Sequence, residues 1–163
     1  MEALVTVYEN AEEADLVVNL IKEIRSMNTY IPELELIMLN DEDEVIGYAM
    51  FSRFHLGGKH MDELLLLTPV AVKIEMQRQH ISKELIEYGF KKAKQMGFKA
   101  VIVEGNPQNY RSRGFQTSAD FGIIAGKSVG IPSVECLMVK ELVAGALDRI
   151  QGVAEYTDYK CLR

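Results

Sequence analysis

A cluster of basic and amide side chains follows the most apolar stretch of the chain. It comprises Lys73, Gln77, Arg78, Gln79, His80, Ser82 and Lys83. Apolar residues with helical spacing come directly afterwards, so this cluster should surround the start of a helix. A helix N-terminus presents free N–H groups and the positive end of the helix dipole. The residue types and their placement therefore predict a site for an anion, a phosphate group especially.

The stretch before this cluster predicts a buried strand with an irregularity. Residues 64–72 read LLLLTPVAV, and the run from Leu64 to Leu67 is typical of a strand buried on both faces. Pro69 cannot donate a ladder hydrogen bond, so we expect a bulge or a splayed edge there. The backbone groups released by a bulge need other partners, and an extended ligand beside the strand could supply them. The alternative is an ordinary buried strand that runs into a surface helix.

Composition narrows the class of protein. The chain has 163 residues, 48% hydrophobic and 26% charged, which fits one domain over residues 1–163 with a sizeable core. A net charge of −6 argues against nucleic acid as a partner, and no apolar run predicts a membrane span.

Two isolated cysteines and no visible signal peptide predict the cytoplasm. We expect no metal site, because no carboxylate or thiol pattern accompanies His55 and His60. A homodimer is left open.

Local patterns predict a chain of mixed helices and strands. A helix should begin at Asn10, which can cap it, and end near residues 27–28. The central unit is a strand over 64–72, a helix over 79–96 and a second strand over 99–104. A strand–helix–strand unit of this kind makes its two strands parallel. The other predicted strands are 3–8, 34–39, 45–56 (a hairpin with the preceding one), 120–124 and 134–139.

This combination resembles the GNAT superfamily of N-acetyltransferases. The segments that carry the resemblance are LTPVAVKIEMQRQHISKELI (67–86), KAVIVEGNPQNY (99–110) and RGFQ (113–116). Residues 64–115 are similar to a bacterial branch with a Gly-Asp-Pro-like turn, a tyrosine and a Gly-Phe pair after the second central strand. The resemblance implies an α/β fold with a mixed, mostly antiparallel central sheet. Helices would cover both faces, and the parallel pair of the βαβ unit would be splayed.

The resemblance also implies acetyl-coenzyme A as the cosubstrate. Its pantetheine arm would pair with backbone groups of Val70, Ala71 and Val72, as an added strand does. Its pyrophosphate would lie on N–H groups of the turn, namely those of Gln77, Arg78, Gln79, His80, Ile81 and Ser82. Asn106, Tyr110 and Arg113 would lie near the thioester and the far side of the coenzyme.

The turn departs from the family pattern at two positions. The usual pattern is Gln/Arg-x-x-Gly-x-Gly/Ala, and here it reads Gln77-Arg-Gln-His80-Ile-Ser82. Glycine permits close approach of the backbone to phosphate. The Ser82 hydroxyl could donate to phosphate, whereas His80 could either crowd the ligand or add a donor. We expect the coenzyme to bind at full or reduced affinity, and loss of binding is the alternative.

Acetyl transfer to an amine needs an acid, a base and donors for the oxyanion. We take Tyr110 as the candidate general acid, because its phenol can donate and it follows the second parallel strand. Its alternative role is packing under Gly114-Phe115. The candidate base is Glu104, at the ligand end of its strand. Alternatively, Glu104 is only a solvated residue at the strand end. The base would then be Glu63 or a group that acts through ordered water. N–H groups near Val70 would bind the oxyanion.

The resemblance thus implies an N-acetyltransferase that transfers acetyl from acetyl-CoA to a primary amine by direct attack in a ternary complex. The acceptor would be a small-molecule or protein amine, and the resemblance places it near residues 25–33 and 125–133. The alternative is a catalytically impaired GNAT-like protein that binds CoA or a protein partner without transfer. His80, Ser82 and Thr68 motivate that alternative, because many relatives carry a glutamate near the position of Thr68.

Overall fold

A computed structural model describes the backbone of residues 11–162 and the side chains of residues 14–162. The predicted strand 3–8 and the cap Asn10 lie outside the described residues. The described strands are β1 (Glu35–Leu39), β2 (Val45–Arg53), β3 (Leu64–Val72), β4 (Ala100–Glu104), β5 (Gln116–Thr117), β6 (Ile123–Ala125), β7 (Leu137–Glu141) and β8 (Gly152–Ala154). The helices are α2 (Ala11–Arg25), α3 (Ile81–Gln95) and α4 (Pro107–Tyr110). None of these helices is long and apolar enough to cross a membrane.

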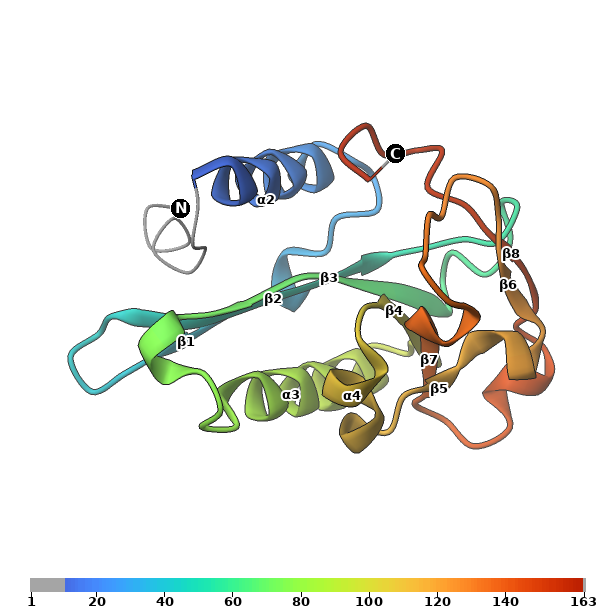
Figure 1. The fold of residues 1–163 in the computed structure, drawn as a ribbon. Coiled ribbons are helices and arrows are strands. Elements are labelled where there is room, and N and C mark those ends of the chain that lie inside the picture. Colours follow the sequence, from blue (N-terminus) through green and yellow to red (C-terminus); the bar gives the residue numbers. More distant parts are fainter. Residues whose placement is uncertain (1–10, 163) are drawn as a thin grey trace.

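The strands form a six-stranded sheet in the order β1-β2-β3-β4-β7-β5 (Figure 1). Only β3 and β4 run parallel within it, and the other neighbours are antiparallel. The predicted βαβ unit and the predicted mostly antiparallel sheet are therefore confirmed. A small parallel sheet of β6 and β8 stands at one end of the molecule, and no strand was predicted at the position of β8.

Helices cover both faces of the sheet, as predicted: α2 lies on one face and α3 on the other (Figure 1). The four leucines of β3 alternate between the two cores because successive strand side chains point to opposite faces. Leu64 and Leu66 join the core that contains Ile21 of α2. Leu65 and Leu67 join the core that contains Leu85 of α3. A strand buried on both faces thus explains the unbroken apolar run.

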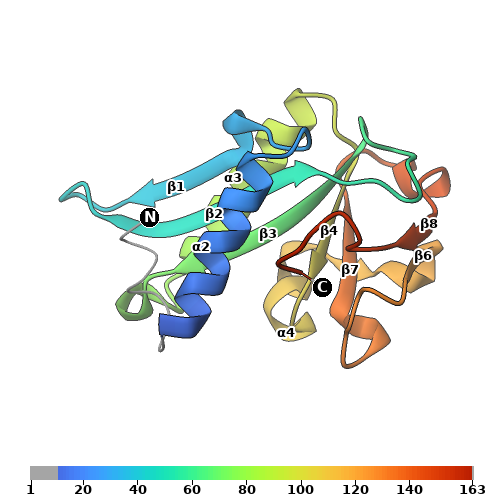
Figure 2. The ribbon, with the colours of Figure 1, turned by 90° about the horizontal axis from the view of Figure 1, so that it is seen from above.

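A bulge interrupts β3 where proline predicted one. Ala49 of β2 lies opposite Val70, and Phe51 lies opposite Leu67, so the two residues Thr68 and Pro69 face a single position of β2. Pairing with β4 stops earlier still: only 64–66 pair, with 100–102. Beyond residue 66 the two parallel strands diverge, as Figure 2 shows from above. The predicted splayed pair is confirmed.

Several predicted boundaries were wrong for local reasons. Helix α3 begins at Ile81 rather than residue 79, because Arg78 and His80 have positive φ angles of 65° and 62°, which no α-helix contains. The predicted helix 79–96 ends one residue early, so Met96 lies beyond the last helical residue and is 42% exposed. Residues 134–136 form a 3-10 turn before β7, and 118–121 form another before β6. The strand predicted over 45–56 ends at residue 53.

A charged cluster fixes the end of α2 and the segment after it. The Glu35 carboxylate accepts hydrogen bonds from Nε of Arg25 (2.9 and 3.1 Å), from the Tyr30 hydroxyl (2.7 Å) and from the Tyr48 hydroxyl (2.6 Å). Partial burial alone would raise the pKa of Glu35, but these hydrogen bonds outweigh it and hold the pKa below its ordinary value. The cluster therefore ties segment 25–35 to the sheet.

This cluster should make stability depend on pH. A group with a depressed folded-state pKa stabilises the protein above its unfolded pKa of about 4.3, and that stabilisation is lost as pH falls further. We expect Glu35→Gln to cost about 1–3 kcal/mol at pH 7, and we expect the difference from the parent to shrink at pH 3.5. Urea unfolding at both pH values measures this. Glu33→Gln, at an exposed neighbour, is the control; an equal Glu35→Gln deficit at both pH values would contradict the prediction.

Gly89 of α3 permits close packing of the helix on the sheet. A Cβ at this position would lie 2.2 Å from Cε2 of Phe51 and 2.5 Å from its Cζ. Although alanine favours helices by about 1 kcal/mol over glycine, we expect Gly89→Ala to destabilise the protein by about 1–3 kcal/mol through overpacking. Chemical denaturation measures the change. Gly130→Ala is the matched control, since a Cβ there has nothing within 4 Å, and a Gly89 variant as stable as that control would refute the packing argument.

Candidate functional site

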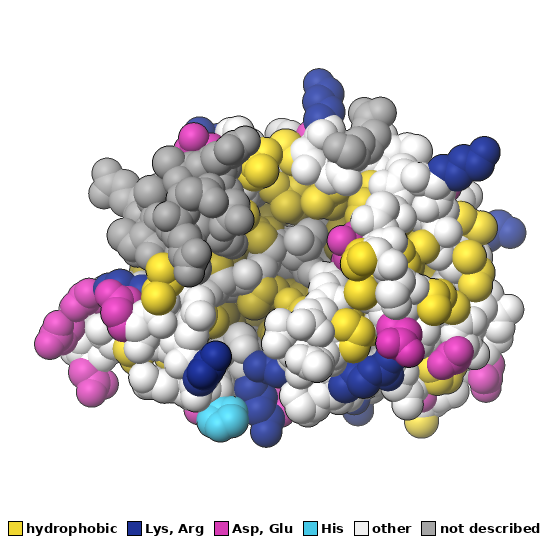
Figure 3. Space-filling view, viewed as in Figure 1, with side chains coloured by type: hydrophobic (Ala, Val, Ile, Leu, Met, Phe, Trp, Pro, Cys, Tyr) yellow, Lys and Arg dark blue, Asp and Glu magenta, His cyan; other side chains and the backbone are white. Residues whose placement is uncertain are grey.

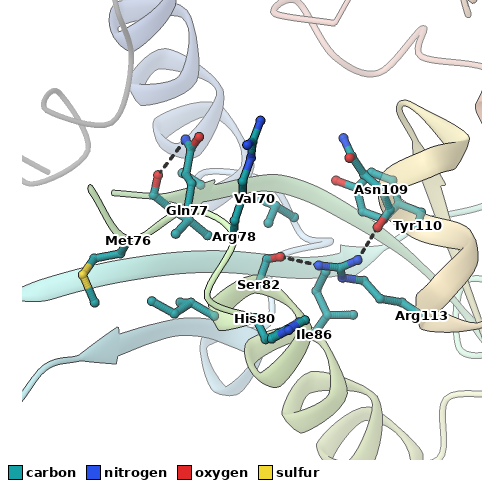
Figure 4. Close-up of a pocket in the computed structure, with 13 residues that line it drawn as sticks. Val70, Met76, Gln77, Arg78, His80, Ser82, Ile86, Asn109, Tyr110 and Arg113 are labelled. Carbon is teal, nitrogen blue, oxygen red and sulfur yellow. Dashed lines mark hydrogen bonds between the residues drawn. The ribbon is translucent and has the colours of Figure 1, made fainter. Parts of the chain in front are cut away.

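A pocket of about 550 Å³ opens beside the unpaired edge of β3, within the size range of small-molecule sites (Figure 4). Its walls are the end of β3, the connecting turn (residues 73–80), the first turns of α3, and the segment 109–113. The lining residues are Val70, Ala71, Val72, Met76, Gln77, Arg78, His80, Ile81, Ser82, Ile86, Asn109, Tyr110 and Arg113. The pocket thus lies where the anion site was predicted.

The edge of β3 presents alternate backbone groups to the space between the strands. Lys73 N–H donates to the Ile46 carbonyl at 2.9 Å, so Lys73 is a hydrogen-bonded position of the pairing with β2. Because such positions alternate along an antiparallel pair, the N–H and C=O groups of Ala71 also point toward β2, whereas those of Val70 and Val72 point away from it. The Val72 carbonyl accepts a 3.4 Å hydrogen bond from the Gln77 amide. Of the three residues predicted to pair with a ligand, two therefore face the gap with their backbone groups.

The start of α3 lies at the floor of the pocket. The first helical hydrogen bond runs from Glu84 N–H to the His80 carbonyl (3.0 Å), and the His80 side chain does not cap the helix. The N–H groups of residues 81–83 consequently have no helical acceptor. The His80 ring is exposed, and its left-handed backbone is a conformation that glycine adopts readily. A histidine thus occupies the turn while the pocket stays open.

Arg113 places a positive charge at this helix start. Its Nη2 donates to the Ser82 hydroxyl at 2.6 Å, and its Nη1 donates to the Asn109 carbonyl (Figure 4). Its Nε is buried without a hydrogen-bond partner among the described residues. Lys and Arg side chains gather on this side of the molecule, between the connecting turn and α4 (Figure 3). The pocket is therefore locally basic in a protein of net charge −6.

Tyr110 both packs in the core and lines the pocket, so its two predicted roles are compatible. Its ring lies edge-on to Phe115, with centroids 5.7 Å apart, and rests on Gly105, where a Cβ would approach its Cε2 to 2.7 Å. Burial raises the pKa of Tyr110, and the charge of Arg113 offsets only part of that rise. The phenol therefore stays protonated at neutral pH. Its hydroxyl forms no hydrogen bond within residues 14–162.

The side chains of Glu104 and Tyr110 lie on opposite faces of the sheet, at the end of β4. Glu104 is the last residue of β4, and its neighbour Val103 points into the α3-side core, so the Glu104 side chain points to the α2 side. There it is exposed and accepts a 2.9 Å hydrogen bond from the Tyr156 hydroxyl. The structure does not place Glu104 in the pocket. It places the two candidate groups on opposite faces of the same strand end.

Other predicted residues lie outside the pocket. Asn106 caps α4 by accepting a 3.0 Å hydrogen bond from Gln108 N–H, and the Gln79 amide contacts the Glu75 carbonyl at 3.5 Å. Glu63, the alternative base, lies at the closed end of the strands, where His60 and then Lys99 lower its pKa. Sequence reasoning missed Met76, Ile86 and Asn109. The helical spacing of Ile86 from Ser82 could have indicated one of them.

No group of three or more His, Cys, Asp and Glu side chains within the described residues could hold a metal ion. His55 instead pairs with Asp158, and His60 pairs with Glu63 at 3.0 Å.

The fold and the pocket together define an acetyltransferase of the GNAT type. The family profile described as the Acetyltransferase (GNAT) family matches residues 4–121, so the chain belongs to this family and is an acyltransferase by class. It is 28% identical over 127 residues to the uncharacterized N-acetyltransferase YhbS of Escherichia coli K12. That alignment covers 77% of this chain and 73% of YhbS.

Solved structures agree with this assignment. The crystal structure of E. coli YhbS in complex with CoA has a TM-score of 0.79 at 26% identity and covers 95% of this chain and 81% of that one. A GNAT family acetyltransferase from Brucella melitensis, in complex with acetyl-CoA, has a TM-score of 0.66 at 22% identity. It covers 99% of this chain and 86% of its own, and shares the fold.

Proposed function

We propose that this protein is an N-acetyltransferase that transfers the acetyl group of acetyl-CoA to a primary amine by direct attack. The observation that carries the proposal is the divergence of β3 from β4 beyond residue 66, with a pocket of about 550 Å³ beside the freed edge. A pantetheine arm carries amides that can pair with the outward backbone groups of Val70 and Val72. The binding of CoA by YhbS supports this choice of ligand.

The phosphates of the coenzyme would bind at the start of α3. The N–H groups of residues 81–83, the dipole of a helix of 15 residues and the guanidinium of Arg113 all favour negative charge there. Arg78 lies in the same turn and lines the same pocket. We therefore assign anion binding to residues 77–82 together with Arg113.

The two candidate catalytic groups would act from opposite faces. An acceptor ammonium on the α2 side gives a proton to Glu104, and the free amine attacks the thioester carbon. The Val70 N–H, which points into the gap, would stabilise the oxyanion. As the C–S bond breaks, the phenol of Tyr110 protonates the departing sulfur. The proton lost by the new amide nitrogen restores the phenol through solvent, so the net products are amide, CoA thiol and one proton.

Isothermal titration with acetyl-CoA tests the ligand assignment. We expect saturable binding by the parent, because the pocket and the helix start are accessible despite His80. His80→Gly should bind at least as tightly, since glycine fits the φ of 62° and allows closer approach of phosphate. No heat from either protein would refute the proposal. Heat only from His80→Gly would favour the alternative of a relative impaired by this histidine.

Replacement of Tyr110 tests the proposed acid. We expect Tyr110→Phe to lower kcat by about 10²–10⁴-fold, because the ring keeps its packing while the proton donor is lost. Acetyl-CoA affinity should change little. Release of CoA thiol with lysine, tyramine and spermidine as acceptors measures the rate. Tyr88→Phe, at a tyrosine 57% exposed on α3, is the control. A Tyr110→Phe variant as active as the parent would remove the acid assignment.

A further inference from the structure

The two oxygens of the Glu104 carboxylate differ in their hydrogen bonding. Oε1 accepts the 2.9 Å hydrogen bond from the Tyr156 hydroxyl. Oε2 forms no hydrogen bond or ion pair within residues 14–162. A flexible carboxylate at an exposed strand end would otherwise sample several rotamers, which weakens it as a base that must meet an amine at one position. The hydrogen bond from Tyr156 therefore restricts the direction in which Oε2 points.

Tyr156 is itself rigidly placed. The residue is 4% exposed, and its ring lies edge-on to Phe54 and Tyr159, with centroids 6.3 and 6.1 Å away. Its backbone N–H donates to the Ser128 hydroxyl at 2.8 Å. Burial, together with the charge of Glu104, raises the pKa of Tyr156, so its phenol remains a donor at any pH at which the enzyme would work. Tyr156 can therefore orient the carboxylate without taking part in proton transfer.

The neighbouring residue ties this tyrosine to the loop at residues 126–129. The Glu155 carboxylate accepts hydrogen bonds from the N–H groups of Ser128 (3.0 Å) and Lys127 (3.2 Å). Gly126 makes this contact possible, since a Cβ there would lie 1.8 Å from Oε1 of Glu155. The loop, residues 155–156 and the carboxylate of Glu104 are thus connected by hydrogen bonds.

The C-terminal tail, residues 155–161, continues from these contacts to α2. The N–H groups of Lys160 and Cys161 donate to the Glu23 carboxylate at 2.9 and 3.1 Å. Seen from above, the segment after β8 runs over the α2 face of the sheet toward that helix (Figure 2). Residues 155–161 therefore bridge the loop at 126–129 and α2, on the face to which Glu104 points.

We propose that Tyr156 is a positioning residue for the acceptor-side base: it holds Oε1 of Glu104 so that Oε2 faces the incoming amine. The proposal rests on the proposed function and deepens it, because it assigns to the C-terminal segment the orientation of the base. Tyr156 lies on the face of β4 opposite the pocket. It should therefore affect the chemical step and leave coenzyme binding unchanged.

A double-mutant cycle of Tyr156→Phe and Glu104→Gln tests this. Thiol release is measured with the best acceptor among lysine, tyramine and spermidine, and acetyl-CoA binding is measured by calorimetry for all four proteins. We expect Tyr156→Phe to lower kcat by about 10–100-fold, as the loss of a hydrogen bond to a charged group would, with acetyl-CoA binding unchanged. Because Tyr156 acts only through Glu104, the double variant should be no slower than Glu104→Gln alone.

Tyr48→Phe is the matched control. Tyr48 is also 4% exposed and also donates its hydroxyl to a glutamate, Glu35, at 2.6 Å. Tyr48→Phe should therefore lose comparable thermal stability, and any change in kcat that it causes should be the same in the parent and in the Glu104→Gln background. Tyr156→Phe with parental kcat, or an equal loss in the parent and in the Glu104→Gln background, would overturn the inference while the proposed function stands. A parent that binds no acetyl-CoA or acetylates none of the three amines would overturn both.

Discussion

The divergence of β3 from β4 is the constraint on which the rest of the structure depends. A buried strand edge must satisfy its backbone groups, and a sheet normally does so by pairing. Here the bulge at Thr68 and Pro69 shifts the register against β2, while the pairing with β4 ends at Leu66. Val70 and Val72 consequently face a pocket with their backbone groups. The central sheet of this family member is thus left open at the position where an extended ligand can continue the ladder.

The two faces of the sheet differ in charge near the end of β4. The pocket on the α3 side combines a helix start with Arg78 and Arg113, against an overall charge of −6. The opposite face presents the carboxylate of Glu104. A carboxylate attracts ammonium groups, whereas the local basic patch favours phosphate. The sheet itself separates the two environments, and the strand end at residue 104 is where they meet.

The face opposite the pocket is assembled from distant parts of the chain. The segment after α2 is fixed to β1 through Glu35, and the loop at residues 126–129 is fixed to the tail through Glu155. The tail in turn bonds to α2 through Glu23. Each of these links joins residues that are separated in sequence, by 10 residues for Arg25 and Glu35 and by 137 for Glu23 and Lys160. Such links convert surface segments into a defined wall.

The sequence by itself determined the features that rest on local chemistry. The run Leu64 to Leu67 specified a strand buried on both faces, Pro69 specified its bulge, and the pattern after residue 80 specified a helix whose start could bind an anion. These features depend on periodicity and on one missing N–H group, so neighbouring residues suffice to predict them. The family pattern then supplied Tyr110 and the residues of the turn.

Only the tertiary structure decided which candidates come together. It separated Glu104 from the pocket, because side chains of adjacent strand positions point to opposite faces, and it set Asn106 and Gln79 aside as residues that contact their own turns. It also brought Tyr156 to Glu104 across 52 residues. The sequence of the tail carries no periodic signal, because β8 has only three residues and pairs with β6 alone. Contacts of that kind exist only once the sheet has brought both ends of the chain to one face.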